Sequence, residues 1–384
     1  MTAGGAFAAV PGGAFAVVTG GGTSGHVLPA LAIADALVAA GHPRAAIHYI
    51  GTQRGVETRL LPPTGYPHTF LDVVGLQRSL STRNLAFLPK LIGSVRAAKR
   101  LLRELQPNVV VNVGGYGSFP ATWAARRLHV PYVVVSYDRR PGLVSKLMAK
   151  RAAACAVAFE GSSLPHAELT GAPVRGEMVR LDRAASRAGA REALGLPADR
   201  FVLAVMCGSL GAAVVNQTVT GAVRRLSGRN DLAVYHIVGD RFLKDAAPTC
   251  AGAEGILYRV IGYEERMAHV YAAADLMITR GGAGTLAEVT TVGVPDIVVP
   301  WPGAAENHQV ANAKALSDHG AVVLIEQADF TVDRLVAEIE RFAASPTELA
   351  GLASKAHAAG SLHRSGKLVA LVERVAASAG NGAP

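Results

Sequence analysis

The chain of 384 residues carries a formal net charge of +9 and is 50% apolar, which excludes an intrinsically disordered protein and predicts about two folded domains. Its 3 cysteines are too few for a disulfide scaffold and lack the spacing of metal ligands, so a reducing cytoplasm is the expected compartment. No apolar run approaches the roughly 20 residues that a membrane-spanning helix needs, and the apolar residues 1–16 lack the positive charge of a secretion signal.

The first half of the chain contains short apolar strands that alternate with amphipathic helices. Continuous apolar strands of this kind belong to parallel sheets that are covered on both faces. Strands are expected at 14–20, 46–52, 108–114 and 131–137, and helices at 29–40 and 91–105.

The second half repeats the pattern, with strands expected at 201–208, 233–239, 275–281, 296–302 and 321–326. Alternating strands and helices imply an α/β fold with two Rossmann-like, doubly wound parallel-sheet domains. Residues 172–199 lack strand character, which indicates a domain boundary at their start. We therefore expect a first domain at 1–171 and a second at 172–361, with a last helix within 362–384 that returns to the first domain.

The positive charge is concentrated in the first half. Residues 1–160 contain 17 Lys and Arg against 6 Asp and Glu, a surplus of 11, whereas residues 161–384 contain 21 against 23, a deficit of 2. An anionic partner is therefore expected for the first domain. Nucleic acid is not expected, because aromatic residues make up only 5% of the chain. Residues 83–105 join an apolar cluster to a basic helix, which suits an anionic membrane surface; a buried helix with a solvated basic face is the alternative.

A glycine-rich loop at 20–25 follows the first expected strand and opens a helix, and it matches the G-x-G-x-x-G pattern of dinucleotide sites. Such a site also needs an acidic residue at the end of the second strand, where this chain has Gly51 and Thr52, so NAD is not expected. The positive end of a helix favours a neutral imidazole at His26, which suits a general base. A histidine that only caps the helix is the alternative.

Two further glycine loops lie in the second domain. Residues 207–212 follow one strand, with Asn216 a turn later, and residues 280–285 follow another, with Glu288 a turn later. A helix N-terminus can hold a diphosphate without a metal, and Glu288 suits ribose hydroxyls. No carboxylate pair with metal-binding spacing accompanies these loops, so no metal and no cofactor are expected. Residues 306–309 are polar and suit sugar hydroxyls, with helix capping as the alternative.

Collinear segments from Gly20 to about Phe330 resemble the MurG family of GT-B glycosyltransferases, which add N-acetylglucosamine (GlcNAc) to the undecaprenyl-linked cell-wall precursor lipid I. The segments are GGGTSGHVLPALAIADAL (20–37), GTQRGVETRLLPPTGY (51–66), VGGYGSFPATWAA (113–125), GAPVR (171–175), GSLGAAVVNQ (208–217), YEERMAHVYAAADLMITRGGAGTLAEVTTVGVP (263–295) and ENHQVANAKAL (306–316). The resemblance implies two domains that face a cleft and an inverting transfer of GlcNAc from UDP-GlcNAc. It also implies a peripheral location on the cytoplasmic face of the cell membrane.

Position by position, the resemblance assigns the donor site to the second domain. It implies that uracil lies beside Tyr263 and the backbone of Glu264, and that Glu288 binds the ribose with Arg280 close by. The sugar and the diphosphate are assigned to Asn216, His308, Gln309, Ser209, Leu210, Gly211, Ala212, Gly282, Ala283, Gly284 and Thr285.

On the acceptor side, the resemblance implies roles for His26, Tyr116, Ser118, Thr23, Ser24 and Gly25. The chain departs from the family at the H-E-x-N motif, which falls on Val135-Ser136-Tyr137-Asp138. Valine cannot move a proton and serine is a poor base at neutral pH, so His26 is the first candidate base and Asp138 the second. A histidine, His308, also stands where the family has one of two glutamines.

Lipid I is therefore the expected acceptor, as a polyprenyl-phosphate-linked anionic molecule. Another natural-product acceptor, of the kind that antibiotic-producing bacteria glycosylate, is the alternative because of the altered motif. Two other classes stay open: a UDP-sugar 2-epimerase and a non-catalytic, membrane-associated scaffold.

Overall fold

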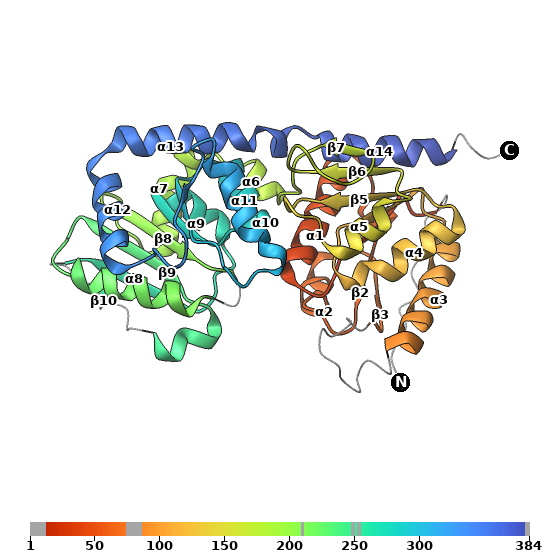
Figure 1. Ribbon diagram of the computed structural model, residues 1–384, viewed down its shortest axis with the longest axis horizontal. Helices are drawn as coiled ribbons and strands as arrows, with labels where there is room; N and C mark the ends of the chain where they lie inside the picture. The colour runs from red at the N-terminus through yellow and green to blue at the C-terminus, as the bar shows by residue number, and fades with distance from the viewer. Residues whose placement is uncertain (1–12, 74–86, 209–210, 247–249, 252–254, 381–384) are drawn as a thin grey trace. The chain divides into compact units, whose positions relative to one another are not determined.

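The computed structural model describes residues 13–73, 87–208, 211–246, 250–251 and 255–380. The chain divides into two compact units, one formed by Met1–Gly176 with Ser365–Pro384 and the other by Glu177–Arg364. Each unit contains a seven-stranded sheet with helices packed around it (Figure 1). This architecture confirms the α/β class with two doubly wound sheets. The division falls after Gly176, whereas the sequence indicates a boundary at 171.

The first sheet is parallel, with its strands in the order β3-β2-β1-β4-β5-β6-β7. Its strands are β1 (Ala16–Thr19), β2 (Ile47–Thr52), β3 (His68–Leu71), β4 (Val109–Asn112), β5 (Tyr132–Ser136), β6 (Ala154–Val157) and β7 (Ala167–Leu169). The helices of this unit are α1 (Ser24–Ala39), α2 (Glu57–Leu60), α3 (Phe87–Leu105), α4 (Phe119–Leu128), α5 (Leu143–Ala149) and α14 (Lys367–Gly380). The four strands expected here are confirmed. The other three are too short and too poor in Val and Ile to give an apolar signal.

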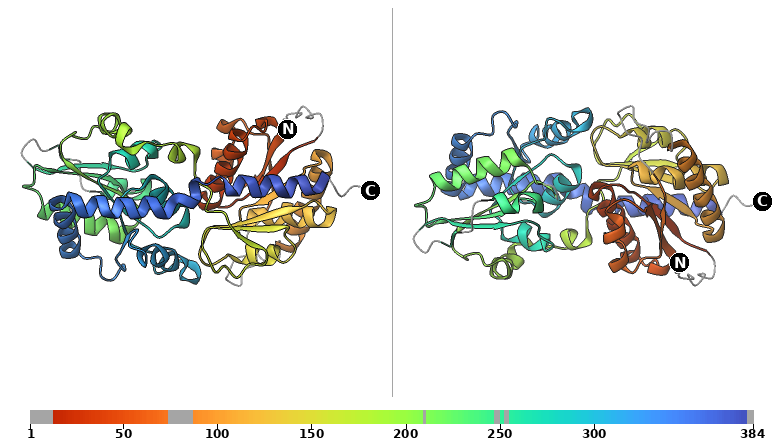
Figure 2. Two further views of the ribbon diagram at one scale, coloured as in Figure 1. Left: turned by 90° about the horizontal axis from the view of Figure 1, so that it is seen from above. Right: turned by 90° about the horizontal axis from the view of Figure 1, so that it is seen from below.

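The central strands β1, β4 and β5 are buried along their whole length, as expected for a parallel sheet covered on both faces. The C-terminal helix α14 packs against β4, β5 and β6, so the end of the chain completes the first unit (Figure 2). Two contacts attach α14 to this unit, a hydrogen bond between Glu373 and His42 at 2.9 Å and an ion pair between Arg374 and Glu168 at 2.6 Å.

The second sheet has the order β10-β11-β9-β8-β12-β13-β14, and only β10 runs antiparallel to its neighbour among the described strands. Its strands are β8 (Phe201–Met206), β9 (Leu232–Ile237), β10 (Cys250–Ala251), β11 (Leu257–Ile261), β12 (Leu276–Thr279), β13 (Asp296–Val298) and β14 (Val323–Leu324). Its helices are α6 (Gly176–Val179), α7 (Arg183–Leu194), α8 (Ala213–Arg225), α9 (Met267–Ala273), α10 (Ala283–Val292), α11 (His308–Ser317), α12 (Val332–Ala344) and α13 (Pro346–Ala359). The five strands expected here are confirmed, and β10 and β11 are additional.

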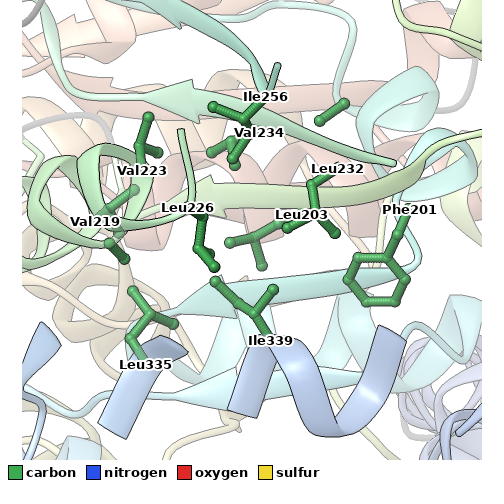
Figure 3. Close-up of a pocket in the computed structure, with 12 residues that line it drawn as sticks. Phe201, Leu203, Val219, Val223, Leu226, Leu232, Val234, Ile256, Leu335 and Ile339 are labelled. Atoms are coloured by element: carbon green, nitrogen blue, oxygen red, sulfur yellow. The ribbon is translucent and has the colours of Figure 1, made fainter. Parts of the chain in front are cut away.

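A small apolar cavity lies in the core of the second unit, where β8 and β9 meet α8 and α12. Figure 3 shows Leu203, Val219 and Val234 approaching Leu335 and Ile339 from the opposite side. Every residue that lines this cavity is apolar. The cavity is therefore a packing gap within the core and offers no polar group to a charged ligand.

The order of the strands in each sheet indicates at which edge of the sheet a ligand would bind. In the first sheet the chain proceeds from β1 to β2 and β3 on one side and then crosses to β4 on the other. In the second it proceeds from β8 to β9 and β11 and then crosses to β12. Ligands of open α/β sheets bind at the carboxyl ends of the strands beside such a crossing point. The loops after β1 and β4, and after β8 and β12, are therefore the candidate site loops.

Candidate functional site

Three loops of the second unit leave the sheet from neighbouring strands. β8 and β12 pair with Met206 opposite Thr279, and β12 pairs with β13 with Thr279 opposite Val298. The loops after these strands are the two expected glycine loops and the segment 299–307. Their residues therefore lie at one edge of the sheet. Two of the expected donor residues, Ser209 and Leu210, lie outside the described residues.

The glycine loops open the helices α8 and α10, and neither helix has a side-chain cap at its N-terminus. The N-cap residues are Ala212 and Gly282, which have no side-chain oxygen to accept a hydrogen bond. A Cβ atom built on Gly208, Gly282 or Gly284 would meet no heavy atom within 4 Å, so the space beside these loops is open. Two uncapped helix N-termini at one sheet edge provide backbone N–H groups and positive potential for an anion such as a diphosphate.

Hydrogen bonds to the segment after β13 and to α11 hold the glycine loop 280–285 in place. Arg280 donates a hydrogen bond from Nη1 to the Val299 carbonyl oxygen at 2.9 Å, and burial lowers the pKa of its guanidinium. The buried Asn312 on α11 donates from Nδ2 to the Gly281 carbonyl oxygen at 3.1 Å. The sequence analysis did not identify Asn312 as a site residue. Its only local signal is an amide side chain one turn into a helix that follows a strand. Glu288 accepts a hydrogen bond from the Tyr271 hydroxyl at 3.0 Å, which orients its carboxylate.

The segment between β13 and α11 has an unusual backbone. Glu306 and Asn307 both adopt left-handed conformations, with φ of 52° and 54°, which costs energy for residues other than glycine and is typical of functional sites. His308 makes a hydrogen bond through Nδ1 to the Ala305 carbonyl oxygen at 2.8 Å. Gln309 accepts one through Oε1 from the Trp301 backbone N–H at 2.9 Å. Among the residues that the structure describes, no hydrogen bond uses the Gln309 amide nitrogen or the His308 Nε2 atom.

The expected uracil residues follow β11. Tyr263 is 47% exposed, so its ring is available to stack on a base. Glu264 is buried, and its carboxylate accepts hydrogen bonds from the Tyr235 hydroxyl at 2.5 Å and from Arg266 at 2.8 to 3.1 Å. Burial opposes ionisation, but these bonds outweigh it and lower the pKa of Glu264 to about 2. Because its carboxylate is engaged, Glu264 can serve a base only through its backbone.

In the first unit, the loops after β1 and β4 pack against each other around His26. A Cβ atom on Gly114 would lie 3.2 Å from His26 Cδ2, and one on Gly22 would lie 2.4 Å from Tyr116 Cε1. Thr23 Oγ1 and His26 Nδ1 are 3.0 Å apart, which leaves Nε2 as the ring nitrogen outside this contact. His26 and Tyr116 are therefore brought to one edge of the sheet. The buried Ser118 hydroxyl instead donates to the Gly115 carbonyl oxygen at 2.9 Å and closes the turn before α4.

A buried glutamate that sequence reasoning missed supports the first glycine loop. Glu57 is 0% exposed, and its Oε1 atom accepts hydrogen bonds from the Thr52 backbone N–H at 2.8 Å and the Thr52 hydroxyl at 2.7 Å. The Gly22 N–H donates to both carboxylate oxygens, at 3.2 and 3.4 Å. Strand β2 ends at Thr52 without an acidic residue of its own, but an acidic side chain reaches that end from the following helix α2. Glu57 folds back from five positions along the chain and contacts the glycine loop directly.

The altered motif lies at the end of β5. Val135 and Ser136, where the family has His and Glu, are both buried within the strand. The Tyr137 hydroxyl donates to the Gly25 carbonyl oxygen in the first turn of α1, and burial raises the pKa of Tyr137. Asp138 follows and is partly exposed. Of these four positions, Asp138 is thus the one whose side chain combines proton-transfer chemistry with access to solvent.

The expected membrane segment begins outside the described residues at 83–86 and continues as α3. One face of α3 is buried through Ala98 and Leu102, while Arg96, Arg100 and Arg103 are exposed. Within the described ranges, no helix combines the length and the hydropathy needed to cross a membrane.

The short helix α5 adds a second exposed surface with apolar and basic side chains. Leu143 is 78% exposed and Leu147 46% exposed, and the neighbouring Lys146 and Lys150 are also exposed.

Across the same described ranges, no group of three or more His, Cys, Asp or Glu side chains has an arrangement that would hold a metal ion.

Two family models match the chain. The N-terminal domain model of glycosyltransferase family 28 matches residues 16–157, and the C-terminal domain model matches residues 202–368. The first match lies within the first unit, and the second covers most of the second unit and ends four residues into the returning segment Ser365–Pro384. The loops described above, after β1, β4, β8 and β12, all fall inside these matched ranges.

Close relatives carry one name, UDP-N-acetylglucosamine–N-acetylmuramyl-(pentapeptide) pyrophosphoryl-undecaprenol N-acetylglucosamine transferase. The protein of this name from Clavibacter michiganensis is 38% identical over 93% of this chain and 95% of its own length. The one from Paenarthrobacter aurescens is 38% identical over 88% of this chain and 90% of its own length.

Solved structures show the same fold. MurG of Acinetobacter baumannii matches with a TM-score of 0.69 and 25% identity, over 94% of this chain and 99% of that one. UDP-GlcNAc 2-epimerase of Neisseria meningitidis matches with a TM-score of 0.65 at 13% identity, over 94% and 99%, which shows a shared fold only. Together with the family models and the relatives, these matches show that the chain is a GT-B glycosyltransferase that belongs to the MurG group of family 28.

Proposed function

We propose that this protein transfers GlcNAc from UDP-GlcNAc to lipid I and so forms lipid II for peptidoglycan synthesis. The observation that carries the proposal is the 38% identity, over 93% of the chain, to a transferase named for this reaction. The second unit supports it, because two uncapped helix N-termini at one sheet edge suit a nucleoside diphosphate.

The donor is held by the second unit in this proposal. The diphosphate meets the N-termini of α8 and α10, the ribose hydroxyls bind Glu288, and the uracil stacks on Tyr263. Asn216, His308 and Gln309 contact the sugar. No step requires a metal, because the helix N-termini supply the positive potential. Activity should therefore persist in excess EDTA, and a loss that Mg²⁺ restores would contradict this part of the proposal.

The reaction is a direct displacement with inversion. The acceptor hydroxyl oxygen attacks the anomeric carbon, its proton passes to a base, and the bond between that carbon and the UDP oxygen breaks with both electrons leaving on UDP. His26 is the proposed base, because it stands in the first turn of α1 beside the glycine loop, and its Nε2 atom can accept a proton in the tautomer whose Nδ1–H donates to Thr23 Oγ1. Asp138 is the second candidate.

The altered motif favours a second candidate function, transfer to a different acceptor. Val135 and Ser136 are buried in β5 and offer neither the imidazole nor the carboxylate of the usual motif. A family member with the same donor and another acceptor, such as a natural product in antibiotic biosynthesis, would fit this change.

One experiment separates these functions. The purified protein is incubated with a panel of UDP-sugars, each with and without a short-chain analogue of lipid I. Transfer of GlcNAc to the analogue is the expected result. Hydrolysis or binding of the donor without transfer would redirect the search to another acceptor, while an epimer formed from the donor alone would identify a 2-epimerase. Donor affinity without turnover on any acceptor would indicate a non-catalytic scaffold.

We also propose that the first unit binds the anionic inner face of the cell membrane from the cytoplasm. The exposed Arg96, Arg100 and Arg103 on α3, with Lys146 beside the exposed Leu143 on α5, support this. Binding to vesicles should rise with the fraction of anionic lipid and fall when Arg96 and Arg100 are both changed to Glu. Binding that ignores lipid charge would contradict the proposal.

A further inference from the structure

A chain of hydrogen-bonded polar side chains lies directly behind Asn216, the residue assigned to the sugar end of the donor site, and its two central members, His236 and Tyr258, are buried. His236 on β9 is 0% exposed, and its Nε2 atom is 3.1 Å from Asn216 Oδ1. Its Nδ1 atom is 2.9 Å from the hydroxyl of the buried Tyr258 on β11. That hydroxyl is 3.3 Å from Thr220 Oγ1, one turn along α8 from Asn216. We call these four side chains the Asn216 relay.

The donors and acceptors of the relay can be assigned by starting from the Val238 backbone carbonyl, which can only accept a hydrogen bond. Asn216 Nδ2 lies 3.0 Å from the Val238 backbone carbonyl, which can only accept, so this atom is the amide nitrogen and Oδ1 faces His236. The amide oxygen in turn can only accept, so Nε2 of His236 carries the proton. Burial lowers the pKa of His236 to about 3, so the ring is neutral and Nδ1 has a lone pair that accepts from the Tyr258 hydroxyl.

The Val238 carbonyl that accepts from Asn216 also lies against the glycine loop 207–212. Gly211 has φ of 64°, and a Cβ atom there would lie 1.9 Å from the Val238 carbonyl oxygen. The loop and the Asn216 amide are therefore located by one backbone group. Polar groups that are fully paired and buried hold a single arrangement, because an alternative rotamer would leave several of them unpaired.

We propose that His236 and Tyr258 are positioning residues that lock the Asn216 amide so that it meets the donor sugar as a hydrogen-bond donor. The locked amide uses its oxygen toward His236 and one N–H toward Val238, and its second N–H is left for an acceptor oxygen on the sugar. The relay thus selects sugars with an oxygen acceptor at this place. This inference rests on the proposed function, since it takes a UDP-sugar as the ligand of the second unit.

The test measures the affinity for UDP-GlcNAc and for UDP by calorimetry in Tyr258→Phe and His236→Leu. Loss of the orienting contact should weaken UDP-GlcNAc about three- to tenfold, the range for one neutral hydrogen bond, and leave UDP within about twofold. Tyr132→Phe is the matched control, because it removes a buried tyrosine hydroxyl that donates to the Met148 carbonyl in the first unit. Nitrogen-15 NMR should show His236 as the neutral Nε2–H tautomer, which checks the hydrogen-bond directions, while a loss confined to UDP-GlcNAc is the readout that a merely structural role would not predict.

A double-mutant cycle with Asn216→Ala completes the test. If the relay acts through Asn216, His236→Leu should cause no further loss of UDP-GlcNAc affinity in the Asn216→Ala background. Equal losses for UDP and UDP-GlcNAc, additive effects in the cycle, or an Nδ1–H tautomer would each overturn the inference. If the unaltered protein prefers another UDP-sugar, the proposed donor is wrong and the cycle with that sugar still tests the relay. Binding of UDP but of no UDP-sugar would overturn both.

Discussion

Glu57 allows a sharp test of how the first glycine loop is held. Its carboxylate is 0% exposed and accepts hydrogen bonds from three donors, the Thr52 N–H, the Thr52 hydroxyl and the Gly22 N–H. Glu57→Ala leaves these donors without a partner, at about 1–3 kcal/mol for each buried group. Because water can enter part of the space, we expect the first unit to lose roughly 3–5 kcal/mol of unfolding free energy. Glu57→Gln keeps one acceptor oxygen and should lose about half as much.

The chain offers a convenient probe for this measurement. It contains 2 tryptophans, Trp123 in the first unit and Trp301 in the second. In a Trp301→Phe background, fluorescence during denaturation in urea reports the first unit through Trp123. Turnover on the lipid I analogue should fall more than tenfold in Glu57→Ala, because His26 lies in the first turn of α1, the helix that the loop held by Glu57 opens. The affinity for UDP-GlcNAc should not change, because every proposed donor residue lies in the second unit.

An exposed glutamate of the same unit provides the control. Glu104 has a side chain 64% exposed and a 4.0 Å ion pair with Arg100, so Glu104→Gln should alter the unfolding free energy by less than about 0.5 kcal/mol. The reasoning is refuted if Glu57→Ala matches Glu104→Gln in stability and turnover. It is also refuted if donor affinity falls as far as turnover, since the effect would then not be confined to the first unit.

Three other predictions follow from single residues. His26→Ala should lower kcat about 100-fold or more without changing the Kd for UDP-GlcNAc, measured by calorimetry; an unchanged kcat would eliminate His26 as the base. Burial raises the pKa of Asp296 from 3.8 to about 7, so the folded state keeps a proton that the unfolded chain loses between about pH 4 and pH 7, and stability falls as the pH rises through that window. The unfolding free energy of Asp296→Asn, measured in urea, should therefore rise relative to that of the unaltered protein by on the order of 4 kcal/mol between pH 4 and pH 8. Plots of unfolding free energy against pH that run parallel for the two proteins would contradict this. Arg191→Leu removes the 2.7 Å ion pair to the buried Asp275, which keeps Arg187 as a second partner, and should cost about 2–3 kcal/mol in the same assay, where a loss under 1 kcal/mol would count against the ion pair.

The parts of the fold that could be predicted from sequence depend on local patterns. Runs of Val and Ile mark the buried strands such as β4 and β8, and glycine clusters mark the turns after β1, β8 and β12, because both features arise from neighbours in the chain. The short strand β7, with Ala167–Leu169, has no such pattern and gains its strand conformation from pairing with β6.

The missed residues of the site depend on contacts between distant segments. Glu57 is 35 residues from Gly22, and Asn312 is 31 residues from Gly281. Apart from the position of Asn312 one turn into a helix, nothing in the neighbouring sequence distinguishes either from a surface residue, since Gly22 and Gly281 lie in loops that follow other strands. The left-handed backbone at Glu306 and Asn307 is similarly set by tertiary structure, because neither residue type requires it.

The two units show how one topology can serve two chemistries. In each, a glycine loop follows the first strand and opens a helix without a side-chain cap. In the second unit the space beside the helix N-termini is open, which leaves their N–H groups for an anionic ligand. In the first unit the Gly22 N–H already donates to the buried Glu57 side chain, so it is used where a nucleotide-binding loop would offer its N–H groups to a phosphate. The surplus of 11 positive charges in residues 1–160 therefore cannot be explained by phosphate binding at Gly22. In the proposed function, exposed cations such as Arg96 and Lys146 attract the anionic membrane surface, and the loop positions the proposed base His26.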